Sequence, residues 1–280
     1  MKKIGFVDLY ISEWHADNYP GWITEVGKKL GLEYEVAYAW AEQEISPVDG
    51  LTTDAWCEKM GIQRCATLAE LCEKSDCIVV LAPSNPEAHL RLAQGVLPYG
   101  KRTYIDKTFA PDLETAQEIF ALAEKYSTPF FSTSALRCAD ELAMFQGAKN
   151  LIVTGGGSNL EEYCVHIIEM AVKVLQTPAK EVKVERIGSQ RICTVVTETG
   201  EKAALIYSRK LPYRLAAETA EGKAIGQQVS SDFFKNLMAD ILRFFESGEL
   251  PFDGKETLEV MRLRDAILAA DQNPGSRVAL

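Results

Sequence analysis

The chain has 280 residues, which at about 150 residues per domain suggests two domains. Hydrophobic residues make up 47% and charged residues 25%, a composition that excludes disordered, collagen-like and disulfide-stapled proteins. The chain carries 30 basic and 40 acidic residues, a net charge of −10. It therefore gains no counterion release from nucleic acid, and anionic membranes repel it. The partner we expect is a small molecule or another protein.

The cysteines and the apolar runs predict a cytoplasmic protein. None of the seven cysteines forms a Cys-x-x-Cys motif, and the three histidines show no zinc-ligand spacing, so no metal is expected. We expect Cys138 and Cys164 to fill the core rather than act as nucleophiles. Asp8 interrupts any signal-peptide core, and apolar runs reach roughly half a dozen residues, against the ~20 that span a bilayer.

In the first half of the chain, apolar runs of strand length alternate with amphipathic helical patterns. Thr67, followed by Glu70, forms a capping box. The alternation predicts right-handed βαβ units and a doubly wound, Rossmann-like parallel sheet over residues 1–137. The predicted strands are 3–9, 33–40, 77–82, 102–105 and 129–133, and the predicted helices are 19–30, 54–60, 68–75, 86–97 and 112–126.

After residue 137 the pattern changes to a smaller α+β domain, predicted over 138–280. Three consecutive strand-like runs separated by turns predict an antiparallel meander. The expected elements are a short helix at 140–146, a strand at 150–154, a long helix at 160–175, the meander at 182–187, 192–198 and 203–208, and closing helices at 231–246 and 255–270.

The turn after the first predicted strand has no glycine. In a doubly wound sheet this turn normally carries Gly-x-Gly-x-x-Gly, which lets the backbone approach a diphosphate. Here it runs from Asp8 to Glu13, and both carboxylates oppose an anion at the helix N-terminus. This turn by itself disfavours a dinucleotide. Tyr10, Trp14 and His15 either line the mouth of a cleft there or pack.

Several later motifs carry a family resemblance. Pro83-Ser84-Asn85-Pro86-Glu87-Ala88-His89 follows an apolar strand, Gly100-Lys101 and Asp106-Lys107-Thr108 come next, and an acid precedes His166 by four residues. With these motifs the chain resembles the Gfo/Idh/MocA family, named for glucose–fructose oxidoreductase and inositol dehydrogenase. The similarity is best over 60–137. It implies a Rossmann domain, an open α+β domain, and hydride transfer between NAD(P) and a sugar, polyol or related hydroxyl compound.

The resemblance also implies the catalytic residues. Lys107 matches the family lysine that lies near the nicotinamide and the substrate hydroxyl, and His166 matches the histidine that exchanges a proton with that hydroxyl. Glu162 stands where the family usually has aspartate. It lies one helical turn before His166 and is expected to orient the imidazole. The plainer interpretations are a solvated loop lysine and a solvated pair worth a few tenths of a kcal/mol.

The cofactor that the resemblance implies is NAD or NADP. Glu42, just past the second strand, is expected to contact the adenosine ribose, and because no arginine stands beside it in the sequence we favour NAD. The remaining implied contacts lie in the turns that follow the strands. The expected cofactor-binding residues are Leu9, Tyr10, Ile11, Glu42, Ala82, Pro83, Ser84, Asn85, His89, Asp106 and Lys107.

Two further features of the second half have open interpretations. Gly155–Gly157 before the helix at 160–175 indicates either a hinge with a helix cap or an anion site, more often the former. Arg137 is expected in a surface ion pair or, less often, on a substrate carboxylate. Because about 130 residues follow position 150, this domain is expected to lack several strands of the family's sheet, which forms a homodimer interface there.

Two other functions compete with the oxidoreductase. One is a catalytically silent relative that acts as a small-ligand sensor or partner subunit, which Asp8 and Glu13 favour. The other, more distant, is a metal-dependent hydrolase, if Glu162, His166 and His89 meet. The joint presence of Lys107 and His166 favours the oxidoreductase.

Overall fold

A computed structural model of the chain describes residues 1–218 and 222–280. The chain forms two compact units, of which the first comprises Met1–Thr133 and Lys235–Asp253 and the second Ser134–Phe234 and Gly254–Leu280. The predicted fold class, a Rossmann-like sheet followed by an α+β domain, is confirmed. Among the described residues, no helix combines the length and the apolar character needed to cross a membrane.

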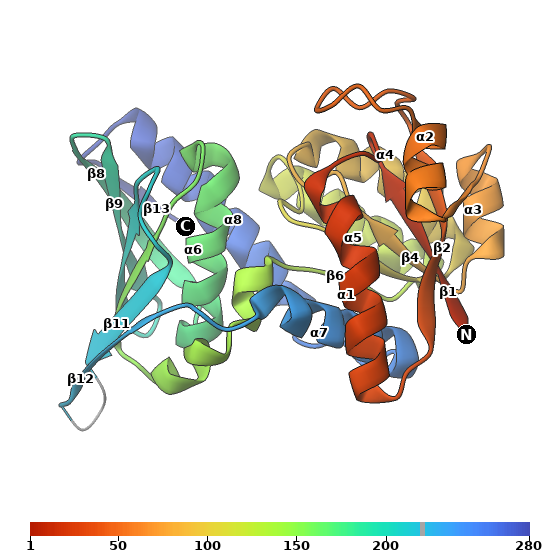
Figure 1. Cartoon of the computed structure of the whole chain (residues 1–280). Coiled ribbons are helices and arrows are strands. Elements are labelled where there is room, and N and C mark those ends of the chain that lie inside the picture. Colours follow the sequence, from red (N-terminus) through yellow and green to blue (C-terminus); the bar gives the residue numbers. More distant parts are fainter. Residues whose placement is uncertain (219–221) are drawn as a thin grey trace. The chain divides into compact units, whose positions relative to one another are not determined.

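The first unit contains a six-stranded sheet in the order β3-β2-β1-β4-β5-β6, with every neighbouring pair parallel. The continuous apolar run of β4 is fully buried, as expected for a central parallel strand. Helices cover both faces of the sheet (Figure 1). The strands are β1 (Lys2–Asp8), β2 (Tyr34–Ala41), β3 (Gln63–Arg64), β4 (Cys77–Val80), β5 (Arg102–Ile105) and β6 (Phe130–Ser132).

Side-chain caps start most helices of this unit. Thr67 accepts a hydrogen bond from the Glu70 amide at 3.1 Å, as the capping box predicts. The first helix begins at Trp14 rather than 19, because Glu13 caps it and Pro20 lies in its second turn instead of its first. The helices are α1 (Trp14–Leu30), α2 (Thr53–Met60), α3 (Leu68–Lys74), α4 (Pro86–Val96), the 3₁₀ turn η1 (Leu97–Tyr99) and α5 (Leu113–Tyr126).

Residues 235–253 return to the first unit, which differs from the predicted division at 137. They include most of α7 (Phe233–Ser247). The ring of Phe244 packs against Phe131 at 5.2 Å between centroids, and Arg102 donates hydrogen bonds to the carbonyls of Phe245 and Glu246. A contiguous boundary misses this return because the contacts join residues more than 100 positions apart.

The second unit has a seven-stranded mixed sheet in the order β12-β11-β7-β10-β9-β8-β13. The predicted meander is present as β8, β9 and β10, whereas β11, β12 and β13 are strands that the sequence did not predict, so this sheet is larger than expected. The short helix predicted at 140–146 is a 3₁₀ helix over residues 140–145. The strands are β7 (Asn150–Gly155), β8 (Ala179–Ile187), β9 (Gln190–Thr197), β10 (Lys202–Tyr207), β11 (Arg214–Glu218), β12 (Ala224–Gln228) and β13 (Arg277–Ala279).

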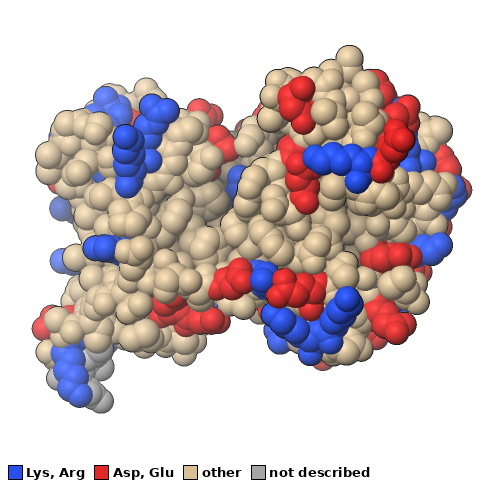
Figure 2. Space-filling view, in the orientation of Figure 1, with Lys and Arg blue, Asp and Glu red and all other residues tan. Residues whose placement is uncertain are grey.

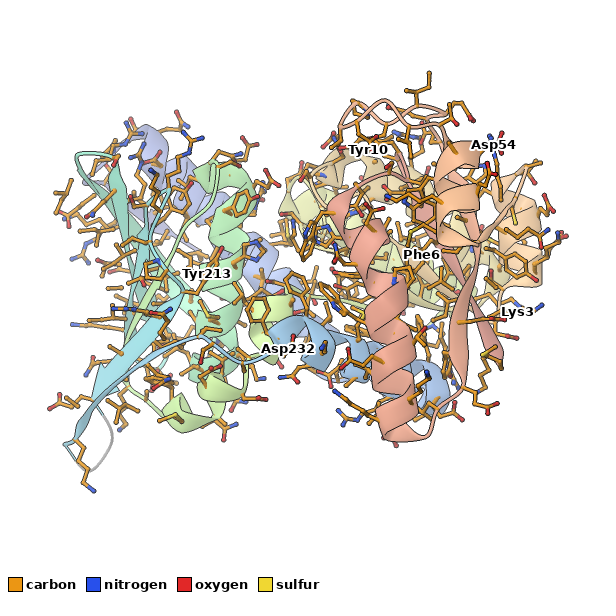
Figure 3. The ribbon with its side chains drawn as sticks, in the orientation of Figure 1. Lys3, Phe6, Tyr10, Asp54, Tyr213 and Asp232 are labelled. Carbon is orange, nitrogen blue, oxygen red and sulfur yellow. The ribbon has the colours of Figure 1, made fainter. Side chains whose placement is uncertain are left out.

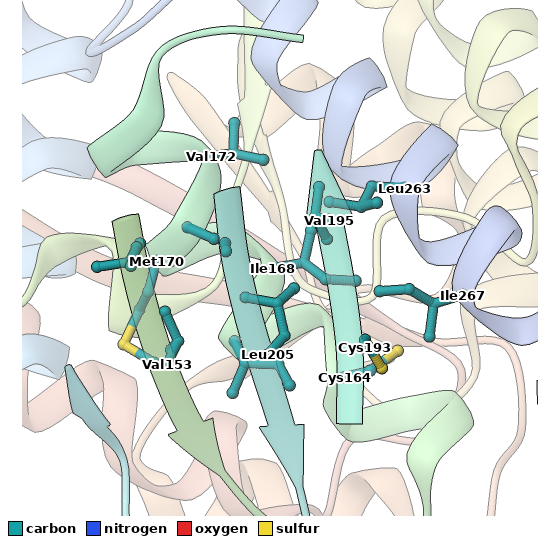
Figure 4. Packing of buried hydrophobic residues seen from close by; sticks show 14 of the residues in the cluster. Val153, Cys164, Ile168, Met170, Val172, Cys193, Val195, Leu205, Leu263 and Ile267 are labelled. Atoms are coloured by element: carbon teal, nitrogen blue, oxygen red, sulfur yellow. The ribbon is translucent and has the colours of Figure 1, made fainter. Parts of the chain in front are cut away.

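One face of this sheet carries the core of the second unit. Apolar side chains of α6 (Leu160–Leu175) and α8 (Gly254–Gln272) pack on alternate residues of the strands (Figure 4). Cys164 and Cys193 lie in this core, and burial raises the pKa of the Cys164 thiol to about 12, so it fills space as predicted. Two 3₁₀ helices, η2 (Ala135–Cys138) and η3 (Asp140–Phe145), precede β7.

Candidate functional site

The candidate site of the first unit lies at the carboxyl ends of β1, β4 and β5. The register pairs Val7 with Val80 and Val80 with Ile105, so Asp8, Leu81 and Asp106 follow at one edge of the sheet. The sequence predicted this edge, because parallel strands that run in one direction end together.

Asp8 is buried at this edge and only half satisfied. Its Oδ1 accepts hydrogen bonds from the amides of Leu9 at 2.7 Å and Ala82 at 3.0 Å, whereas its Oδ2 is buried with no hydrogen-bond partner. Burial, and then the nearby Glu13 carboxylate, raise the pKa of Asp8 well above its ordinary value. Asp8 therefore joins the turn after β1 to the turn after β4.

Replacing Asp8 by asparagine tests the raised pKa of this buried carboxyl. Because the pKa of Asp8 is raised in the folded state, protonated Asp8 contributes to the free energy of unfolding. That contribution is complete below the unfolded-state pKa of about 3.9 and is lost as the pH rises through the folded-state pKa. Asp8→Asn has the shape of the protonated acid and does not ionise. We expect the variant to lose less Tm than the wild type between about pH 5 and pH 9, by several degrees, since about 1 kcal/mol shifts Tm by about 2–4 °C. Equal losses in thermal unfolding would contradict the assignment.

The Glu13 side chain caps the helix that follows the turn after β1. Its carboxylate accepts hydrogen bonds from the amides of His15 at 2.8 Å and Ala16 at 2.5 Å, and lies 2.9 Å from His15 Nδ1. These are the N-terminal amides of α1, which attract anions. The turn also places Leu9 and Ile11 with buried side chains and Tyr10 half-buried at its tip (Figure 3).

Asp106 is the second buried carboxyl of this edge. Its Oδ1 accepts hydrogen bonds from the hydroxyls of Tyr104 at 2.8 Å and Tyr19 at 3.3 Å. Its Oδ2 is buried without a hydrogen-bond partner and lies 3.8 Å from His15 Nε2. His15 thus stands between Glu13 and Asp106, an arrangement that holds the imidazole ring in one orientation.

Lys107 follows directly and is 8% exposed. Its Nζ donates a hydrogen bond to the Pro83 carbonyl at 3.2 Å, so the ammonium group is held against the turn after β4. In this turn Ala82 has a φ of 60°, a left-handed conformation that an alanine rarely adopts. Ser84 is exposed and Asn85 half-buried at the start of α4.

His89 is buried beneath the turns after β4 and β5, where it contacts backbone carbonyls. The ring is fully buried in α4, and its nitrogens lie 2.9 Å from the Phe109 carbonyl and 2.5 Å from the Leu81 carbonyl. Burial lowers the pKa of His89. The imidazole therefore fastens the turns after β4 and β5 to one another, and it is not available as a metal ligand.

Glu42 carries a partner that the sequence did not indicate. Arg91 of α4 donates from Nε to both carboxylate oxygens of Glu42, at 3.1 and 2.9 Å. An arginine does stand beside Glu42, so the argument from its absence, which favoured NAD over NADP, is wrong. The two residues are 49 positions apart and meet only because α4 packs next to β2's end.

In the second unit, the imidazole of His166 contacts the hydroxyl of Ser134. Its Nδ1 lies 2.6 Å from Ser134 Oγ, and the half-buried imidazole stands between the rings of Tyr163 and Tyr213, at 5.6 and 5.8 Å between centroids. Glu162 begins the same helix, where its amide donates to Asn159. This contact holds Nδ1 of the imidazole at the Ser134 hydroxyl.

A buried ion network supports Ser134. Arg137 donates to Glu169 at 3.2 Å and to Glu256, and Glu169 also accepts the Ser134 amide at 3.1 Å. Arg137 is 4% exposed, so the predicted surface ion pair is in fact buried. Lys173 donates to the Arg137 carbonyl at 2.7 Å. The network fixes η2 to α6 and so fixes the partner of His166.

Gly155–Gly157 allow tyrosines to pack around His166. A Cβ on Gly157 would lie 1.9 Å from Tyr163, and one on Gly155 would lie 2.5 Å from Tyr213, so only glycine fits. The hydroxyl of Tyr213 donates to the Gly156 carbonyl at 2.7 Å, and Tyr213 lies beside α6 (Figure 3). The helix cap is Asn159, and these glycines serve close packing.

The residues that sequence reasoning missed are Ser134, Tyr163, Tyr213 and Glu169. Glu169 is 3% exposed. The signal that was available was the i,i+3 spacing of His166 and Glu169, which puts them on one helix face. Their partners come from a different segment, so the sequence could not supply them.

Metal-ligand chemistry adds no further site among residues 1–218 and 222–280. No group of three His, Cys, Asp or Glu side chains in that part of the chain is arranged to hold a metal ion. On the face of each unit drawn in Figure 2, basic side chains are interrupted by acidic and uncharged ones.

Comparison with known proteins places the fold. No protein-family model matches the chain, and no curated protein matches its sequence. Solved structures match over nearly the whole chain. An NAD-binding protein from Listeria innocua has a TM-score of 0.72 at 14% identity and covers 99% of this chain and 96% of its own. The UDP-N-acetylglucosamine 3-dehydrogenase of Acidithiobacillus ferrooxidans has a TM-score of 0.74 at 11% identity, with 96% and 97% covered.

A third match is an oxidoreductase from Agrobacterium radiobacter, solved with NAD⁺, L-tartaric acid and magnesium. Its TM-score is 0.73 at 15% identity, and 99% of this chain and 98% of that chain are covered. Because these structures match nearly the whole of both chains, the two-domain fold that the resemblance implies is confirmed.

Proposed function

We propose that the chain is an NAD(P)-linked oxidoreductase that transfers hydride between the nicotinamide and a hydroxylated small molecule such as a sugar or polyol. The observation that carries this proposal is Lys107, which is held at the carboxyl end of β5 on a fold shared with NAD-binding dehydrogenases. This edge is where doubly wound sheets bind nucleotides.

The residues after β4 and β5 fit the ribose and nicotinamide of such a cofactor. Ala82 turns the backbone sharply, and strained backbone of this kind concentrates in ligand-binding turns. Ser84 and Asn85 offer hydroxyl and amide groups beside it, and Lys107 offers a cation. The Glu42 side chain is partly exposed and can accept hydrogen bonds from ribose hydroxyls beside Arg91. The bound nicotinamide would supply the hydride acceptor or donor.

The family resemblance assigns proton chemistry to Lys107 of the first unit and to His166 of the second unit. The ammonium group of Lys107 donates a hydrogen bond to the substrate hydroxyl and stabilises its developing negative charge. His166, whose Nδ1 lies at the Ser134 hydroxyl, is the residue that the resemblance assigns as acceptor of the hydroxyl proton. We assign the orientation of the His166 imidazole to Ser134. Glu162 lies in the first turn of the same helix and adds a negative charge there.

The test is a titration of the purified chain with NADH and with NADPH, read by energy transfer from its four tryptophans. Trp14 lies in the first turn of α1 and should report binding at this edge. Saturable binding, followed by reduction of NAD⁺ or NADP⁺ with a member of a sugar and polyol panel, is expected. If neither NADH nor NADPH binds at concentrations up to about 1 mM, the affinity is weaker than that of a cofactor site and the proposal is overturned.

The sensor function remains the second candidate because of one observation, the carboxylate of Glu13 on the α1 amides. A sensor binds its small ligand without reducing a nicotinamide. Ligand binding by calorimetry in the absence of any NAD(P)⁺ turnover, with both cofactors failing to bind, would favour this second function over the first.

We also propose a homodimer through the open face of the second sheet. A groove of about 490 Å³ is lined there by Ile152, Ala204 and Ala216, and Ile152 is 45% exposed. Replacing Ile152 by aspartate puts a charge in the interface and is expected to convert the dimer to monomer, measured by light scattering during gel filtration. Ile187→Asp, at an exposed position of β8 that does not line the groove, is the matched control. A monomeric wild type would contradict the dimer.

A further inference from the structure

The subsite where a doubly wound sheet binds a diphosphate is filled here by the chain itself. The α1 amides of His15 and Ala16 donate to the Glu13 carboxylate at 2.8 and 2.5 Å. In dinucleotide-binding turns, amides at this helix terminus receive the phosphate oxygens. Glu13 is 8% exposed, so its carboxylate is built into the turn rather than lying on the surface.

A second observation shows that this place disfavours a further negative charge. Asp8 lies close enough to Glu13 for the Glu13 charge to raise the pKa of Asp8, and Asp8 Oδ2 is buried without a hydrogen-bond partner. A diphosphate would bring two further negative charges to a place that already holds one carboxylate on the amides. Like charges in a site of low dielectric constant repel strongly.

The turn is also covered from outside. Ser12 donates to Asp49 at 2.8 Å, and Ser46 donates to the Ser12 carbonyl at 2.7 Å. The amide of Gln43 donates to the Leu9 carbonyl at 2.7 Å. The segment after β2 therefore fastens the turn in the conformation in which Glu13 caps α1.

We propose that Glu13 occupies the diphosphate subsite and sets the affinity of the first unit for a dinucleotide, which binds there only when the carboxylate leaves the His15 and Ala16 amides. This inference rests on the proposed function and deepens it. Glu13 is a specificity-determining residue, because it penalises ligands that carry a diphosphate relative to ligands that do not. His15, at 2.9 Å from Glu13, helps to hold the carboxylate in place.

The experiment compares NADH binding by the wild type, Glu13→Gln and Glu13→Ser, read by tryptophan energy transfer. Glutamine keeps the size of the cap and removes the charge, and serine is a good helix cap that is shorter and neutral, so α1 stays capped in both. We expect both variants to bind NADH at least about tenfold more tightly than the wild type. Glu118→Gln, on an exposed position of α5, makes the same change in net charge and is expected to bind as the wild type does.

Two results would contradict the proposals in different ways. If the wild type binds NADH and Glu13→Gln and Glu13→Ser bind it no more tightly, the inference about Glu13 is overturned and the oxidoreductase proposal stands. If neither the wild type nor these variants bind NADH, the proposed function fails, and the inference that rests on it fails as well. Raised stability of Glu13→Ser in the presence of NADH, measured as Tm, is the second readout for a gain in binding.

Discussion

Replacing Lys107 by methionine is expected to lower turnover by at least about 100-fold, the usual contribution of a positioned proton donor. Methionine keeps the aliphatic length that packs in the turn and removes the ammonium group that donates to the Pro83 carbonyl. The rate of NAD(P)⁺ reduction with the substrate found in the panel measures the loss, and the NADH affinity of the variant separates chemistry from binding. The loss should lie mainly in kcat, because the ammonium group stabilises charge that develops only in the transition state.

Two further variants define what the Lys107 result means. Lys101→Met changes a lysine just before the start of β5, the opposite end of the same strand, and should leave turnover unchanged. His166→Asn should lower turnover by a similar factor to Lys107→Met, because the proton acceptor is removed. A Lys107→Met protein with wild-type kcat would remove Lys107 from the proposed mechanism.

Replacing Arg137 by methionine is expected to destabilise the second unit by about 3–5 kcal/mol, the usual cost of breaking a buried ion pair on one side. The substitution leaves Glu169 and the partly buried Glu256 without their cation. The Ser134 amide donates a hydrogen bond to Glu169, so it then loses its fixed acceptor. Because Ser134 holds His166, the orientation of His166 is lost as well. Thermal and urea unfolding measure the change in stability.

The double variant Arg137→Met with Glu169→Gln is expected to be more stable than Arg137→Met, since the uncompensated buried charge is removed. Arg243→Met is the control for an exposed pair, with Asp240, and should cost about 1 kcal/mol or less. If Arg137→Met unfolds at the wild-type temperature, Arg137 does not carry the network that the structure shows.

The parallel sheet and its site edge were predictable because they depend on local signals. The apolar run of β4, the capping box at Thr67 and the alternation of helices and strands each lie within a few residues. The position of Lys107 after a strand then follows from the direction of parallel strands. The absence of glycine after β1 likewise predicted that a diphosphate is disfavoured there. The structure gives a reason, because Glu13 caps the N-terminal amides of α1.

Other features escaped prediction because they join distant parts of the chain. Arg91 meets Glu42, and Arg137 is buried between Glu169 and Glu256, although nothing near either arginine in sequence indicates its partner. The strands β11 to β13 are short and partly exposed, so their apolar pattern is weak, and they are strands only because neighbours supply hydrogen bonds.

The sequence by itself determined the fold class, the edge of the sheet that carries the candidate site, and the residue types at that edge, because periodicity and caps act over short distances. Only the tertiary structure decided what those residues contact. It turned His89 into a buried clamp, gave His166 a serine partner, and placed Glu13 on the α1 amides. The physical reason is that a polar side chain is satisfied by whichever donor or acceptor packing brings near, and packing depends on the whole chain.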